Sequence, residues 1–190
     1  MLFTDDFNGV VLRNGIKGVT LEREDSDHFF IKAGAGEPWH NFVGYCVEKN
    51  YNGVENLSLI PGTVGAAPIQ NIGAYGVELR DVFYNLEAIN LKTGEKRLFN
   101  NEDCKFAYRD SVFKKEYKGE YVICYVTFML KKQPDFNISY GGLKAELDAL
   151  PIAELNAKWV SDAVCSIRRS KLPDPAVIGN AGSFFKNPIV

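Results

Sequence analysis

A long stretch without any charged side chain, residues 56–77, constrains this sequence more than any other feature. Its length would suit a helix that crosses a membrane. Pro61 and Pro68, the glycines of the stretch and the amides of Gln70 and Asn71 argue against such a helix, because hydrocarbon cannot pair the polar groups that they leave open. We therefore expect this uncharged segment to form irregular backbone packed inside a globular protein, with no membrane association.

Irregular backbone inside a protein needs partners for its N–H and C=O groups, and a planar heteroaromatic cofactor is one source of them. The small residues that would let the main chain approach such a ring are Gly62, Gly65, Ala66, Ala67, Gly73, Ala74 and Gly76. The alternative is a glycine-rich loop of the core that binds no ligand. The residues alone leave both interpretations open.

Composition and charge limit the other classes of function. The 190 residues are 46% apolar, and a net charge of -2 offers no basic patch to nucleic acid or to an anionic membrane. The first residues lack the pattern of a secretory signal, so we expect a cytoplasmic protein. With two histidines and no C-x-x-C pair, we expect no metal site. The cysteines, predicted to be reduced and buried, are Cys46, Cys104, Cys124 and Cys165.

Hydrophobic spacing predicts helices and strands without regular β-α alternation. A helix should begin at residues 37–38, where a proline precedes apolar residues at helical spacing. Residues 121–130 are typical of a strand too apolar for a sheet edge, and residues 92–95 of a hairpin turn. Two further helices are expected over residues 143–150 and 153–170. This pattern favours the α+β class.

Two positions outside the uncharged segment carry possible chemistry. Arg109 stands among aromatic and apolar neighbours, so we expect its charge to be partly buried. It could form a structural ion pair with Asp110 or a more distant carboxylate, or it could hold a substrate carboxylate. Ser183 lies in a loop of small residues, where it could cap a turn or donate a proton to a developing carbanion.

Five motifs follow one another along the chain: residues 55–76, residues 108–111, residues 140–143, residues 171–175 and residues 179–188. Together they resemble the UDP-N-acetylenolpyruvoylglucosamine reductase family over essentially the whole chain. The resemblance implies an α+β FAD-binding fold of the vanillyl-alcohol-oxidase type. It also implies three parts: residues 1–25 as a remnant of a first FAD-binding subdomain, 26–171 as the second subdomain and 172–190 as the start of a substrate-binding domain.

The same resemblance implies a reaction and its residues. NADPH would reduce FAD, whose N5 would pass a hydride to the enolpyruvyl ether of UDP-N-acetylglucosamine, giving UDP-N-acetylmuramate for peptidoglycan. Arg109 matches the arginine that holds the substrate carboxylate and steadies the enolate, and Ser183 matches the general acid. Substrate-binding positions match Tyr108, Tyr140, Lys171 and Asn187. The flavin would lie against Ile60, Pro61, Gly62, Gly65, Ala66, Gln70, Asn71, Gly73 and Tyr75.

Three departures from the family accompany the resemblance. Ala66 stands where the family often has serine, so a backbone contact would replace a side-chain contact with the cofactor. The family's loop for the FAD pyrophosphate is expected before Leu2, and its substrate domain, with a catalytic glutamate, beyond Val190. On this expectation the chain alone binds FAD weakly and has little reductase activity. The alternatives are another oxidoreductase on the same FAD fold and a flavin- or nucleotide-binding module without catalysis.

Overall fold

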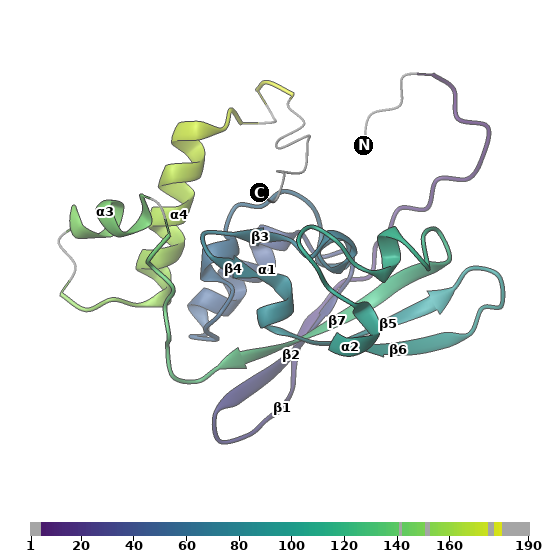
Figure 1. Ribbon diagram of the computed structural model, residues 1–190, viewed down its shortest axis with the longest axis horizontal. Coiled ribbons are helices and arrows are strands. Elements are labelled where there is room, and N and C mark those ends of the chain that lie inside the picture. Colours follow the sequence, from purple (N-terminus) through teal and green to yellow (C-terminus); the bar gives the residue numbers. More distant parts are fainter. Residues whose placement is uncertain (1–4, 141, 151–152, 175–176, 180–190) are drawn as a thin grey trace.

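The computed structural model describes residues 5–140, 142–150, 153–174 and 177–179. Its centre is a five-stranded antiparallel sheet in the order β1-β2-β7-β5-β6 (Figure 1). The strands are β1 (Val19–Glu24), β2 (His28–Gly34), β5 (Phe83–Asn90), β6 (Lys96–Asn100) and β7 (Tyr121–Lys131). Strand β7 lies in the middle, where its apolar side chains are covered. This confirms the prediction that residues 121–130 are not at an edge.

Helix α1 (Trp39–Glu48) packs its apolar side on the sheet. Pro38 directly precedes it, as the sequence predicts, and Trp39 and Phe42 are almost completely buried. The Phe42 ring lies 4.5 Å from the ring of Phe128 in β7. Trp39 also donates from Nε1 to the Leu57 carbonyl at 2.8 Å. The helix is therefore fixed to both the sheet and the uncharged segment.

A second, smaller hydrophobic cluster lies beside the first and contains α3 (Leu143–Asp148) and α4 (Ala157–Lys171). Leu143 and Val160 are fully buried where the two helices meet. Both helices were predicted, but α4 begins after residue 153. The reason is local, since the Asn156 side chain accepts a hydrogen bond from Trp159 N at 3.0 Å and caps the first turn.

The predicted hairpin at residues 92–95 joins β5 and β6. Asn90 Oδ1 accepts hydrogen bonds from the backbone N–H groups of Lys92 at 2.8 Å and Thr93 at 3.1 Å. Gly94 has a φ of 74°, a conformation that side chains with a Cβ rarely adopt. The hairpin turn is therefore specified by its own residues.

All four cysteines are free and buried, and burial raises the pKa of each thiol, that of Cys104 to about 12.

One mixed arrangement of sheet and helices confirms the α+β class. The proposed division at residue 25 falls in the turn between β1 and β2, which pair along their length. That division stays a prediction. No helix among the described residues is long and apolar enough to cross a membrane.

Candidate functional site

The uncharged segment folds as a series of single turns followed by a very short hairpin. Its 3-10 turns are η1 (Glu55–Leu57), η2 (Val64–Ala66) and η3 (Pro68–Gln70), and its hairpin strands are β3 (Gly73–Ala74) and β4 (Val77–Glu78). The prediction of irregular backbone is confirmed. The expectation that the segment is packed inside the protein is only partly correct, because Pro61, Gly62, Ala66, Ile69 and Gln70 are exposed. Gly76 and Val77 line a cleft of about 200 Å³ together with Glu55. A wider cavity along the segment stays a prediction.

Backbone contacts attach the first half of the segment to the sheet and to α1. Gly65 N donates to the Ala35 carbonyl at 2.9 Å, and the Gly62 carbonyl accepts from Trp39 N at 3.0 Å. A Cβ added to Gly65 would lie 2.5 Å from the Ala35 Cβ. Glycine is therefore required at this position for close packing, whether or not a cofactor is bound.

Asn71 holds the second half of the segment together and is fully buried. Its Nδ2 donates to the Ala107 carbonyl at 3.0 Å and to Glu78 Oε2 at 3.1 Å, and its Oδ1 accepts from Arg80 N at 3.0 Å. One amide thus joins the segment to the loop of Ala107 and to β4. Its left-handed backbone, with a φ of 43°, suits asparagine better than most residues.

The residues predicted to contact flavin differ in exposure. Exposed residues are Pro61, Gly62, Ala66 and Gln70; half-buried ones are Ile60, Gly73 and Tyr75; and buried ones are Gly65 and Asn71. The exposed residues can meet a ligand directly, whereas Gly65 and Asn71 support the backbone behind them. The flavin contacts themselves stay predictions.

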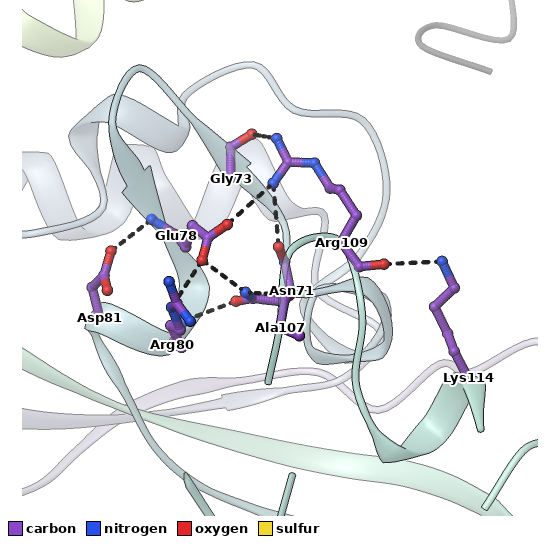
Figure 2. A network of polar contacts seen from close by, with 8 residues as sticks. All are labelled: Asn71, Gly73, Glu78, Arg80, Asp81, Ala107, Arg109 and Lys114. Carbon is purple, nitrogen blue, oxygen red and sulfur yellow. Dashed lines mark hydrogen bonds and ion pairs between the residues drawn. The ribbon is translucent and has the colours of Figure 1, made fainter. Parts of the chain in front are cut away.

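Arg109 lies in a tight turn that faces this segment (Figure 2). Ala107 and Asp110 exchange two backbone hydrogen bonds of 3.1 Å each, so Tyr108 and Arg109 form the tip of the turn. Arg109 has a φ of 53°, and its carbonyl accepts a hydrogen bond from Lys114 Nζ at 3.0 Å. Ser111, directly after the turn, donates from Oγ to the Ile69 carbonyl at 2.7 Å and ties the turn to η3.

The guanidinium of Arg109 rests on the backbone of the uncharged segment. Its Nη2 donates to the Gly73 carbonyl, and its Nη1 donates to the Asn71 carbonyl at 3.5 Å (Figure 2). Nη1 also lies 3.8 Å from Glu78 Oε1, and the Tyr108 ring centroid is 5.1 Å from the guanidinium carbon. About a third of the side chain is exposed. The structure therefore joins Arg109 to two of the predicted cofactor residues.

The ionic partner of Arg109 answers one of the questions that the sequence left open. Asp110 pairs with Lys115 at 2.7 Å, while Arg109 faces Glu78. The carboxylate near Arg109 therefore comes from a different segment of the chain. A structural ion pair and a ligand-holding role are compatible here, because a 3.8 Å separation is too long for a hydrogen bond.

Several residues in and around the uncharged segment have a strained backbone conformation. Leu59, Asn71, Tyr75 and Arg109 are among the non-glycine residues with positive φ, and such conformations are often found at functional sites. His40 Nδ1 accepts a hydrogen bond from Leu59 N at 3.1 Å, and Arg168 Nε donates to the Leu59 carbonyl at 3.3 Å. Burial lowers the pKa of His40, and the charge of Arg169 adds to this effect.

The other predicted substrate residues are only partly brought together. Tyr140 is more than half exposed, and its ring lies 6.1 Å from that of Tyr75 in an edge-to-face arrangement. Lys171 is exposed at the last turn of α4. Ser183 and Asn187 lie outside the described residues, so their roles stay predictions.

Sequence reasoning missed Glu78 and Arg168, which both contact the candidate site. A signal for Glu78 was present, because Glu55 and Glu78 are the first charges on either side of the uncharged segment. Both carboxylates are largely covered. Glu55 accepts a hydrogen bond from Gly53 N at 2.7 Å, and burial raises the pKa of its carboxyl group.

Comparisons with known proteins identify relatives of this chain. A protein from Amoebophilus asiaticus named UDP-N-acetylenolpyruvoylglucosamine reductase is 55% identical to this chain over all 190 residues. A protein of the same name from Pseudomonas syringae is 52% identical over the same 190 residues. The chain covers 56% of each, so it spans about half the length of the curated relatives that it matches. The crystal structure of UDP-N-acetylenolpyruvylglucosamine reductase from Thermus caldophilus matches with a TM-score of 0.60 and 22% identity, over 83% of this chain and 48% of that one.

These matches confirm the resemblance that the motifs predicted, and the structural match confirms the α+β FAD-binding fold. The described residues hold no group of three His, Cys, Asp or Glu side chains that could bind a metal ion. A family model described as an FAD binding domain matches residues 2–97. Because that match covers just over half of its residues, the chain belongs to the family of FAD-binding domains.

Proposed function

We propose that this chain forms the flavin-binding part of a reductase that converts UDP-N-acetylenolpyruvoylglucosamine into UDP-N-acetylmuramate with NADPH. The observation that carries this proposal is the guanidinium of Arg109 lying on the Asn71 and Gly73 carbonyls of the uncharged segment. The two reductases that match the whole chain support it over another oxidoreductase on the same fold. We place the activity in the cytoplasm, in the synthesis of peptidoglycan precursors.

The outer side of the uncharged segment suits the flat ring system of FAD. Pro61, Gly62, Ala66 and Gln70 are exposed there, and a Cβ added to Gly62 would meet no atom within 4 Å. Small side chains leave the backbone polar groups accessible to a ring that carries donors and acceptors. FAD bound at this position would carry the hydride from NADPH to the substrate.

Arg109 would make the substrate a better hydride acceptor. The alkene of an enolpyruvyl ether accepts hydride poorly unless its carboxylate can take up negative charge. A guanidinium beside that carboxylate stabilises the charge, and more strongly in a half-buried position than in water. Tyr108, Tyr140, Lys171 and Asn187 would hold the UDP-sugar, and Ser183 would donate the proton that completes the reduction.

Replacing Arg109 with methionine in the holoenzyme that contains this chain tests the proposal. We expect NADPH to reduce the flavin at an unchanged rate. Reoxidation by the enolpyruvyl substrate should slow by roughly a hundredfold to a thousandfold, because the developing charge loses its main donor. Stopped-flow absorbance separates the two steps.

Arg23→Met serves as the matched control for this substitution. Arg23 lies on β1 and stacks on Phe30 with its guanidinium carbon 3.3 Å from the ring centroid, away from the uncharged segment. Both half-reactions should keep their parental rates in that variant. Parental reoxidation in Arg109→Met would contradict the proposed function.

A further inference from the structure

Glu78 directly follows the uncharged segment and faces Arg109, and other groups hold its carboxylate in place (Figure 2). Its Oε2 pairs with Arg80 Nε at 2.8 Å and accepts a hydrogen bond from Asn71 Nδ2 at 3.1 Å. The backbone N–H of Glu78 donates to Asp81 Oδ2 at 2.7 Å. About four-fifths of the side chain is covered. The carboxylate is therefore held in place independently of Arg109.

The second oxygen of this carboxylate faces Arg109 without bonding to it. Oε1 lies 3.8 Å from Arg109 Nη1, which gives attraction between the charges but no hydrogen bond. A guanidinium has five N–H donors in a planar fork. The Glu78 carboxylate can therefore orient the fork while leaving donors available for a bidentate bond to another carboxylate.

Gly73 provides the space in which this arrangement fits. A Cβ at Gly73 would lie 2.6 Å from Arg109 Nη1 and 3.0 Å from Glu78 Cγ. Both side chains therefore approach the β3 backbone closely. A residue with a Cβ at position 73 would not leave room for this approach. The two side chains and the hairpin backbone form one packed unit.

We propose that Glu78 is a positioning residue that aims the Arg109 guanidinium at the carboxylate of the substrate. This inference rests on the proposed function, which assigns Arg109 to that carboxylate. Glu78 holds Arg109 against the Gly73 and Asn71 carbonyls. The turn in which Arg109 has a positive φ brings its side chain to these carbonyls. Glu78 itself contacts no reacting atom. Its contribution is preorganisation, which removes the cost of orienting the guanidinium during the reaction.

The substitution Glu78→Gln keeps the shape of the side chain and removes its charge. In the holoenzyme we expect flavin reduction by NADPH to be unchanged. Reoxidation by the enolpyruvyl substrate should slow by roughly tenfold to a hundredfold, the range expected when a binding group is misplaced by about 1 Å. Glu116→Gln is the matched control, because Glu116 forms an exposed ion pair with Lys105 at 2.8 Å on another loop. It should leave both rates at the parental value.

A double-mutant cycle with Arg109→Met separates positioning from a general structural role. If Glu78 acts through Arg109, adding Glu78→Gln to Arg109→Met should slow reoxidation no further. A further loss in that background, or parental reoxidation in Glu78→Gln alone, would overturn the positioning role. Parental reoxidation in Arg109→Met would instead overturn the proposed function, so the two failures can be told apart.

Glu78→Asp keeps the test decisive if Glu78→Gln does not fold. Aspartate retains the charge but is shorter by one methylene, so its carboxylate stands farther from Arg109. We expect a loss in the reoxidation rate that is smaller than the loss in Glu78→Gln and that also disappears in the Arg109→Met background. Reoxidation at the parental rate in Glu78→Asp, or a further loss when Glu78→Asp is added to Arg109→Met, would contradict the inference.

Discussion

At the scale of single residues, the candidate site depends on side chains that bond to backbone. Asn71 joins its own segment to the loop of Ala107, and Arg109 donates to the Asn71 and Gly73 carbonyls. Buried backbone groups must be paired, and the carbonyls of Leu57, Ile69 and Gly73 accept hydrogen bonds from side chains outside the uncharged segment. The polar side chains near the segment therefore serve the fold as well as any ligand.

His40 gives a prediction at this scale that depends on pH. Its Nδ1 accepts from Leu59 N at 3.1 Å, and protonation would replace this acceptor with a donor. Burial, and then the charge of Arg169, lower the pKa of His40 in the folded protein, so the unfolded chain binds the proton more readily. The contribution of His40 is fully present above its ordinary pKa of about 6.5 and is lost as the pH falls below that value.

The measurement is the melting temperature between about pH 7.5 and about pH 5.5. The parent protein should lose stability over this range, and His40→Asn should lose less, because its side chain does not titrate. Other titrating groups are common to both proteins and cancel in the difference. Parallel profiles for the two proteins would show that the His40 contact is not sensitive to protonation.

At the scale of elements, close backbone contacts decide where the uncharged segment lies. The segment's η2 turn meets the chain just after β2 at Gly65 and Ala35, and their backbones bond at 2.9 Å. Gly65→Ala would bring a Cβ within 2.5 Å of the Ala35 Cβ and 3.1 Å of its carbonyl oxygen. We expect a loss of about 1–3 kcal/mol in the free energy of unfolding, as for other overpacked sites.

Gly44→Ala is the control for this prediction. Gly44 lies within α1, and a Cβ there would meet no atom within 4 Å. Alanine favours helix by up to about 1 kcal/mol over glycine, so this variant should be as stable as the parent or more stable. Urea denaturation of both variants gives the comparison. Equal stability for Gly65→Ala and the parent would mean that η2 can move away from β2 without cost.

Local signals explain which elements the sequence predicted. Pro38 before apolar residues at helical spacing specifies the start of α1, and Asn90 with Gly94 specifies the hairpin turn, so both follow from neighbours in the chain. The contact between Glu78 and Arg109 could not be predicted in this way. It depends on a strand and a turn that are distant in sequence, and nothing in the identity of Arg109 indicates its positive φ.

At the scale of the whole molecule, the uncharged segment connects two hydrophobic clusters. Val64 and Ile72 belong to the cluster around the sheet, while Tyr75 packs against the cluster of α3 and α4. Asn56 Nδ2, at the start of the segment, donates to the Tyr75 and Asn137 carbonyls at 2.9 and 2.7 Å. Tyr75, one of the predicted cofactor residues, thus also packs against the second cluster, so the segment that would meet a cofactor joins the two clusters.

The last prediction concerns the buried hydroxyl contact between these clusters. Ser58 Oγ donates to the Glu55 carbonyl at 2.6 Å, so it can accept the proton of Ser161 Oγ, which lies 2.7 Å away on α4. Ser58→Ala and Ser161→Ala should each lower the free energy of unfolding by about 1–3 kcal/mol, because each leaves a buried hydroxyl with one partner fewer. The double variant should lose less than the sum of the two, by about 1 kcal/mol. Urea denaturation of the four proteins measures this coupling. Ser166→Ala is the control, because Ser166 lies on the exposed side of α4, where its hydroxyl bonds to Glu146 at 2.6 Å in contact with water and contributes little. Strict additivity of the two losses would show that this hydroxyl pair does not couple α4 to η1.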